Sequence, residues 1–458
     1  MMNEKEEGYS ARKTIIKSII IGLVSFIAAQ VLFGFVMYAS TLVPQEAIRA
    51  NMEKSADRIC ENPPFYVMMR GLMPTMIDGY ADAITLNIAW NLDGEDHLRD
   101  SLMCEFLTSD SINQTFNFGS AVKGDIDESH YIKQYLRYWH GSSALMRFMH
   151  LFMSVKEVYI TNGFIIAILT VLNILVFIRN KIYDCAIAFS VGLIASNTLF
   201  VPLCLEYTWV YIVMLTVNLL VSLVLTSGGE TKNIGKKTSL CIYIIFLGAM
   251  TVNFLDFLTA ETLTLTVPLL IMSRIVREKK VYILPLAGTV SWGAGYAGTW
   301  VSKWIISSIV LKENVLPYIT EHISERLGGE VYGDPVSQAG QIFGAIGRNI
   351  INLFPIGYGA PGIAGFIVIA IFLSYYVFVY RKKGADPGKI IVYAAIGLIP
   401  YIRYIVLHNH SYIHRFFTCR AQMATVMAVL LTVFEVTEIK GAHKNIKIGS
   451  QKSRKARK

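Results

Sequence analysis

Long apolar segments recur along the chain and are separated by polar connections. Ten of them approach or reach the roughly 17 to 25 residues that an α-helix needs to cross a bilayer. These segments lie at about 14–39, 158–178, 184–204, 207–226, 238–255, 259–274, 281–299, 360–380, 389–407 and 421–437. The pattern predicts an all-α polytopic membrane protein with about ten transmembrane helices.

Two longer intervals, 41–157 and 300–359, interrupt this series of apolar segments. The first contains "ADAITLNIAW" and "YIKQYLRYWHGSSALMRFMHLFM", and the second of these stretches is typical of an amphipathic helix at a membrane interface. We therefore expect short helices that lie along the membrane surface as a structured cap. The chain then forms one membrane domain, 1–437, followed by a basic tail, 438–458.

Composition and charge narrow the class further. Of the 458 residues, 53% are hydrophobic and 16% are charged, whereas about a quarter of a soluble domain is charged. The net charge of +9 comes largely from the tail and from connections such as "RNK", "KNIGKK", "RIVREKK" and "RKKGADPGK", so it does not indicate nucleic-acid binding. The positive-inside rule assigns these connections and both termini to the cytoplasm, and the two long intervals to the outer side.

The first candidate constellation is "MIDGYADAITLNIAW" at 76–90. Asp78 and Asp82 are four residues apart, so a helix would place both carboxylates on one face. The alternative is that Asp78 caps the helix and Asp82 is a surface charge.

A second pair of carboxylates lies in the middle of the chain, in "NFLDFLTAETLTLTVPLL" at 253–270. Asp256 and Glu261 would stand at the outer turn of a tight helical hairpin, close to membrane depth. Ionisable groups there usually have a functional partner, although both residues are also compatible with a turn in water.

Two aromatic stretches could contact a sugar or a lipid headgroup. In "SWGAGYAGTWVSKW" four aromatic residues recur every fourth position, and Trp300 and Lys303 belong to this stripe; an interfacial aromatic belt explains it equally well. The other stretch, "RYWHGSSALMR" at 137–147, holds Trp139 and His140 and fits either a headgroup anchor or a wall of a sugar site.

The stretch "HNHSYIHRFFTCR" at 408–420 precedes the last apolar segment. His410 and His414 have the i, i+4 spacing of half a zinc site, but no set of further ligands lies nearby in the sequence. Together with Arg415 and Arg420 they suit a phosphate or diphosphate better, because charged hydrogen bonds to phosphate oxygens are strong.

The chain resembles the bacterial members of the GT-C class of membrane glycosyltransferases. Four stretches carry the resemblance: "IDGYADAITLN", "RYWHGSSALMR", "NFLDFLTAETLTLTVPL" and "HNHSYIHRFFTCR". The resemblance implies a GT-C-like fold with its catalytic site on the outer face of the membrane. It also implies an essential acidic residue in the loop after the first span, which here matches Asp78 and, less closely, Asp82.

The expected function is transfer of a hexose or pentose from a polyprenyl-phosphate donor to a cell-envelope glycan, glycolipid or protein, with inversion. Asp78 would be the general base or a metal ligand, and a divalent metal (Mg²⁺ or Mn²⁺) stays open. His410, His414, Arg415, Arg420 and Lys303 would bind the lipid phosphate. The residues expected to contact acceptor or sugar are Trp139, His140, Asp256, Glu261 and Trp300.

The expected location is the cytoplasmic membrane of a bacterium, and no nucleic acid is expected as a partner. One alternative is a transporter or flippase for a lipid-linked glycan, although the sequence has no internal repeat of the kind many transporters show. A glycan ligase or polymerase of the O-antigen type, and a non-catalytic member of an envelope complex, are further alternatives.

Overall fold

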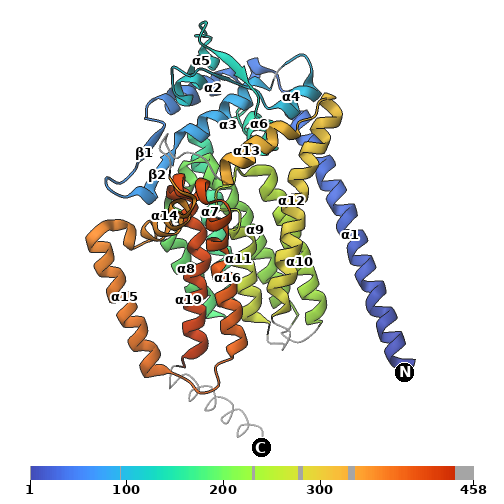
Figure 1. The fold of residues 1–458 in the computed structure, drawn as a ribbon, viewed down its shortest axis with the longest axis vertical. Helices are drawn as coiled ribbons and strands as arrows, with labels where there is room; N and C mark the ends of the chain where they lie inside the picture. Colours follow the sequence, from blue (N-terminus) through green and yellow to red (C-terminus); the bar gives the residue numbers. More distant parts are fainter. Residues whose placement is uncertain (1, 93, 229–232, 277–281, 328–335, 439–458) are drawn as a thin grey trace, which may run out of the picture.

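The computed structural model describes residues 2–92, 94–228, 233–276, 282–327 and 336–438. The predicted basic tail, 438–458, therefore lies almost wholly outside the described residues. Helices dominate the described part, as the apolar pattern predicts. They form a bundle with a smaller cap at one end, and α1 and α15 stand on opposite flanks of the bundle (Figure 1).

The bundle is built from helices at the positions of the predicted spans. Their bounds are α1 (Met2–Thr41), α7 (Val155–Arg179), α8 (Tyr183–Ala195), α9 (Leu205–Thr226), α10 (Ile234–Leu255), α11 (Leu263–Ile275), α12 (Ile283–Leu311), α15 (Gly359–Tyr380), α16 (Pro387–Val406) and α19 (Met423–Val436). Within the described residues, seven helices are long and apolar enough to cross a membrane. The polytopic membrane class is thus confirmed. The count of ten spans stays a prediction, because α8, α11 and α12 are not among these seven helices, and α8 and α11 have only 13 residues each.

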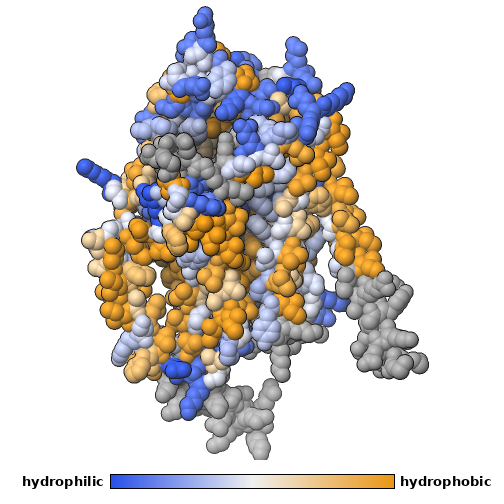
Figure 2. Space-filling model, viewed as in Figure 1, coloured by the Kyte–Doolittle hydropathy of each residue, from blue (hydrophilic) through white to orange (hydrophobic). Residues whose placement is uncertain are grey.

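The bundle exposes the apolar surface that a bilayer requires. Figure 2 shows hydrophobic residues gathered over the bundle helices and hydrophilic residues over the cap. Burial separates the helices into inner and outer ones: 67% of the apolar window of α9 is buried, against 11% for α1 and 6% for α15. The inner helices α9 and α19 therefore form the centre of the fold, and α1 and α15 present most of their surface outward.

The cap comes from the first long interval and contains short helices together with strands that the sequence pattern does not predict. Its elements are α2 (Gln45–Cys60), β1 (Phe65–Val67), η1 (Met73–Thr75), β2 (Met76–Asp78), α3 (Gly79–Asn91), α4 (His97–Met103), β3 (Phe106–Thr108), α5 (Gln114–Lys123), β4 (Tyr131–Lys133) and α6 (Gly141–Met149). Strands β1 and β2 pair antiparallel with Phe65 opposite Asp78. Strands β3 and β4 pair with Phe106 opposite Lys133.

Shorter elements from the rest of the chain join the cap to the bundle. They are η2 (Thr198–Leu203), α13 (Leu316–Leu327), α14 (Gln338–Ile351), η3 (Ile356–Tyr358), α17 (His408–Ile413), α18 (Arg415–Thr418) and η4 (Cys419–Gln422). The hydroxyl of Tyr318 on α13 donates to the Gln134 carbonyl of the cap over 3.2 Å. Asn349 on α14 donates to the Ser411 carbonyl on α17 over 3.0 Å. Residues from the second long interval thus lie over the ends of the bundle helices.

Candidate functional site

A cavity of about 530 Å³ lies where the cap meets α9, α13 and α17. Its volume is in the range of ligand sites in proteins. It is lined by Phe65, Asp78, Tyr80, Ala81, Ile84, Phe106, Lys133, Gln134, Tyr135, Arg137, Glu206, Phe257, Tyr318, His410, Ile413, His414 and Phe417. Both strand pairings contribute, because Phe65 faces Asp78 across one pair and Phe106 faces Lys133 across the other.

Asp78 is the acidic residue that the sequence places first, and it lines this cavity. It ends β2 and caps α3, with its Oδ1 accepting from the Ala81 backbone N–H over 2.9 Å. The predicted N-cap and the predicted site residue are thus the same carboxylate. Burial raises the pKa of Asp78 to about 7, because a carboxylate taken from water loses the solvation of its charge.

Glu206 is a second carboxyl group in the cavity, and it is not among the site residues predicted from the sequence. It stands in the first turn of α9, it is 6% exposed, and its carboxyl group is close enough to that of Asp78 for a hydrogen bond if one of the two is protonated. Among the described residues, its Oε2 has no hydrogen-bond partner. In the sequence, a glutamate at the start of an apolar segment is typical of a segment boundary. Only the position of Glu206 at the predicted membrane surface indicated a functional residue.

Asp82 does not line the cavity but supports it. Its carboxylate accepts from the backbone N–H of Leu205 over 2.9 Å and from the Tyr159 hydroxyl over 2.6 Å. It also accepts from the Glu206 N–H over 3.3 Å. A carboxylate at a helix N-terminus satisfies free N–H groups and the helix dipole. Asp82 therefore fixes the start of α9, and with it Glu206.

His410 and His414 both line the cavity, as part of α17 and the residue that follows it. Their ring centroids are 4.7 Å apart. The His414 ring stacks on Phe417, with centroids 5.1 Å apart and an interplanar angle of 19°. The structure thus brings together Asp78 and these two histidines, from stretches that lie more than 300 positions apart in the chain.

The permanent positive charge in the lining comes from Arg137 and Lys133, which were not among the predicted phosphate ligands. The Arg137 guanidinium lies over the Tyr135 ring at 4.2 Å from its centroid, and its Nη2 donates to the Tyr135 hydroxyl over 2.9 Å. Its Nε has no hydrogen-bond partner among the described residues. The guanidinium of Arg137 is thus held by aromatic rings within the lining.

The predicted cations Arg420 and Lys303 lie outside the lining. Arg420 is buried, and its guanidinium donates to the carbonyls of Phe416 over 2.8 Å and of Pro74 over 3.2 Å. Lys303 is buried and donates to the Leu102 carbonyl over 2.7 Å. These two cations join the bundle to the cap by satisfying backbone carbonyls. Arg415 is also absent from the lining.

The aromatic residues predicted to contact a sugar or acceptor also lie outside the lining and contact other parts of the protein. The Trp139 indole is buried and donates to the Thr299 carbonyl over 3.0 Å. The His140 ring is buried beside Phe257, with centroids 5.0 Å apart. Neither residue lines the cavity, and Trp300 does not line it either. The motif "RYWHGSSALMR" therefore reaches the cavity through Arg137 alone.

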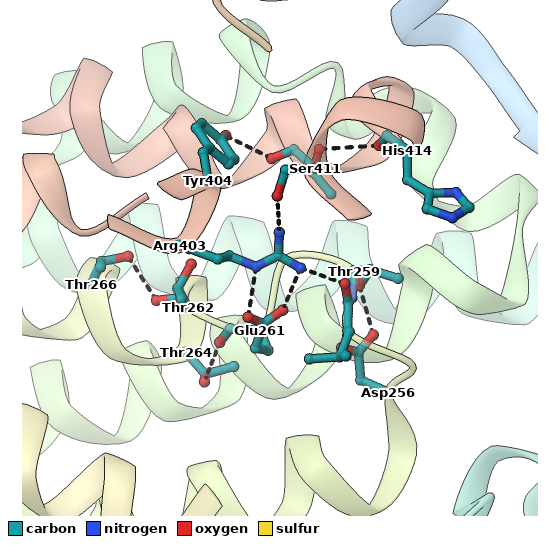
Figure 3. A network of polar contacts seen from close by, with 12 residues as sticks. Asp256, Thr259, Glu261, Thr262, Thr264, Thr266, Arg403, Tyr404, Ser411 and His414 are labelled. Atoms are coloured by element: carbon teal, nitrogen blue, oxygen red, sulfur yellow. Dashed lines mark hydrogen bonds and ion pairs between the residues drawn. The ribbon is translucent and has the colours of Figure 1, made fainter. Parts of the chain in front are cut away.

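Asp256 and Glu261 belong to a buried polar network beside the cavity (Figure 3). Glu261 forms an ion pair with Arg403 of α16, with 2.7 Å between Oε1 and Nε. The same guanidinium donates to the Ser411 hydroxyl of α17 over 3.2 Å. Asp256 accepts from the backbone and side chain of Thr259, over 3.0 and 2.6 Å. This network connects the α10–α11 turn to the helix that carries His410.

Within the described ranges, no group of three or more His, Cys, Asp or Glu residues is arranged to hold a metal ion. Comparison of the chain with protein-family models, with curated proteins and with solved structures finds no match. The resemblance to GT-C glycosyltransferases therefore stays a prediction, and the function must be argued from the cavity itself.

Proposed function

We propose that the protein is an integral membrane glycosyltransferase that moves a sugar from a polyprenyl-phosphate carrier to an acceptor hydroxyl group. The observation that carries the proposal is a single cavity that holds a buried carboxyl group, two histidines and an arginine beside aromatic rings. The carboxyl group is that of Asp78, the histidines are His410 and His414, and the arginine is Arg137. A glycosyl transfer of this type needs a base, a site for phosphate and a surface for a sugar.

Asp78 suits the part of the general base. Its pKa of about 7 lies near neutral pH, where a base can be both ionised and strong enough to take a proton. Its helix cap fixes the carboxylate, so the acceptor hydroxyl would meet a preorganised group. A positioned carboxylate base typically contributes about 10²–10⁴-fold to the rate.

Arg137, Lys133 and the two histidines suit the phosphate of the donor. Charge grows on the phosphate oxygens as the bond to the sugar breaks, and fixed donors near those oxygens stabilise it. Arg137 is the strongest candidate because its planar guanidinium can donate two parallel hydrogen bonds to one phosphate. It takes the place that the sequence analysis gave to Arg420 and Lys303.

The remaining lining suits a sugar. The lining includes the aromatic residues Phe65, Tyr80, Phe106 and Phe257, and apolar walls with a few polar groups are typical of small-molecule sites. The prenyl chain of the donor would stay in the bilayer, since the cavity adjoins the apolar bundle, and only the headgroup would enter.

The proposed step balances without a further reactant. The acceptor oxygen forms a bond to the anomeric carbon, and its proton passes to Asp78. The bond from the anomeric carbon to the phosphate oxygen breaks, and its electron pair stays on the phosphate. Attack from the face away from the phosphate inverts the anomeric centre. We place the reaction on the outer face of a bacterial cytoplasmic membrane, where cell-envelope glycans, glycolipids or proteins supply the hydroxyl.

The test is sugar transfer in proteoliposomes with a synthetic polyprenyl-phosphate hexose or pentose and a soluble acceptor. We expect Asp78→Asn to lower transfer by at least about 100-fold, as the loss of a general base requires. Wild-type transfer should rise with pH and level off above about 7, since Asp78 must be ionised to accept a proton.

The matched control is Asp125→Asn, which changes an exposed aspartate of the cap and should transfer sugar at the wild-type rate. Full transfer by a normally folded Asp78→Asn protein would refute the catalytic assignment. A wild-type protein that only moves the lipid-linked sugar across the bilayer would favour the flippase alternative instead.

A further inference from the structure

Asp78 and Glu206 both belong to the wall of the cavity, and their carboxyl groups are close enough for a hydrogen bond if one of them is protonated. They are only 3% and 6% exposed. An ionised carboxylate has no hydrogen to donate, so a hydrogen bond between the two groups can form only when they share one proton. Two buried like charges in the wall of one cavity would also repel each other.

The surroundings do not remove the need for that proton. Among the described residues, neither carboxyl group has an ion-pair partner. The neighbouring acidic groups are Asp82 of α3 and Asp256 of the α10–α11 turn, and neither of them can neutralise a carboxylate. His410 and His414 of the α17 segment, and Lys133 and Arg137 of the cap, line the same cavity.

The position of Glu206 is fixed by its helix. The Glu206 N–H and the Leu205 N–H both donate to Asp82, over 3.3 and 2.9 Å. The backbone of Glu206 is therefore held by the same helix, α3, that Asp78 caps. Glu206 belongs to the lining of the cavity, and its buried Oε2 has no hydrogen-bond partner among the described residues.

We infer that Asp78 and Glu206 work as one proton-sharing pair, in which Glu206 carries the shared proton and directs a carboxyl oxygen to a hydroxyl group of the bound sugar or acceptor. This inference rests on the proposed glycosyltransferase function. Asp78 is the member that receives the proton of the acceptor hydroxyl. Glu206 keeps its proton through the transfer, and its hydrogen bond holds Asp78 in place.

If the two carboxyl groups share a proton, Glu206→Gln and Glu206→Ala should lower the rate of sugar transfer by different amounts. Glu206→Gln retains an N–H group that can donate to Asp78, so transfer should fall by no more than about 10-fold. Glu206→Ala removes the donor and the cavity contact, and transfer should fall by at least about 100-fold, close to the loss in Asp78→Asn. The control Glu53→Gln, at an exposed glutamate of α2, should have wild-type activity. If Glu206→Gln loses as much activity as Asp78→Asn, the assignment of the proton to Glu206 is wrong.

Infrared spectroscopy of the reconstituted protein tests the pair without any substrate. At neutral pH the wild type should show the C=O stretching band of a protonated carboxyl group, and the wild-type minus Glu206→Gln difference spectrum should contain it. A difference spectrum without this band overturns the inference, whatever the transfer assay gives. If the band is present but wild type transfers sugar from none of the donors, the proposed function fails and the carboxyl pair stands.

Discussion

Single side chains decide which parts of the motifs reach the cavity. The stretch at 408–420 holds several cationic or titratable residues, yet only His410 and His414 line the cavity, whereas Arg420 satisfies two backbone carbonyls. Asp78 caps α3 and Asp82 lies in its first turn, yet Asp78 lines the cavity whereas Asp82 caps α9. A buried charge needs a partner, and whether that partner is a carbonyl or a ligand depends on tertiary packing.

Arg137 gives the clearest prediction at this scale. We expect Arg137→Gln to raise the apparent KM for the polyprenyl-phosphate donor by about 10- to 100-fold, because hydrogen bonds to charged groups contribute about 1.5–3 kcal/mol. Arg137→Lys should recover only part of this affinity, since an ammonium group lacks the planar fork of donors. Donor titrations at fixed acceptor concentration measure both effects.

The control for this experiment is Arg99→Gln, which changes an exposed arginine on the same cap. Its KM should equal that of the wild type. An unchanged KM in Arg137→Gln would remove Arg137 from the phosphate site.

At the scale of elements, hydropathy predicts the bundle well and the cap only in outline. The apolar segments match helices because the length of each segment and the spacing of its apolar residues can be read directly from the sequence. The strands β1 to β4 have three residues each, too few for an alternating pattern to show. Glu206 was missed for a related reason, since its importance comes from contact between α9 and α3 and not from its neighbours in sequence.

The buried ion pair between Arg403 and Glu261 should stabilise the junction of α16, α17 and the α10–α11 turn. Arg403→Gln leaves the Glu261 carboxylate buried without its partner, so the free energy of unfolding should fall by about 3–5 kcal/mol. The double variant with Glu261→Gln removes that unpaired charge and should recover part of the loss. Thermal unfolding in detergent measures both changes.

The exposed Arg381 provides the comparison, because Arg381→Gln should leave the unfolding temperature unchanged. A double variant that unfolds as early as Arg403→Gln would mean that the Glu261 charge does not cause the destabilisation.

For the whole molecule, the sidedness of the cap is the prediction on which the proposed function most depends. We expect the cap outside and the connection at 180–182 in the cytoplasm. The experiment uses a Cys60→Ser background, because Cys60 is the one cysteine of the described residues that is not buried. In this background, Ser129→Cys should react with an impermeant maleimide added to intact cells. A cysteine at Lys181 should react only after the cells are opened, and the opposite pattern would place the cavity in the cytoplasm.

The contacts between cap and bundle also set an order in time. Arg420 bonds to the carbonyl of Pro74 across 346 positions of the chain. At a synthesis rate of about 5–20 residues per second, the segment that contains Arg420 is made roughly 15 to 70 seconds after the segment that contains Pro74. During that interval the cap has left the ribosome without the helices that complete the cavity. A nascent chain should therefore have no working site until synthesis is almost finished.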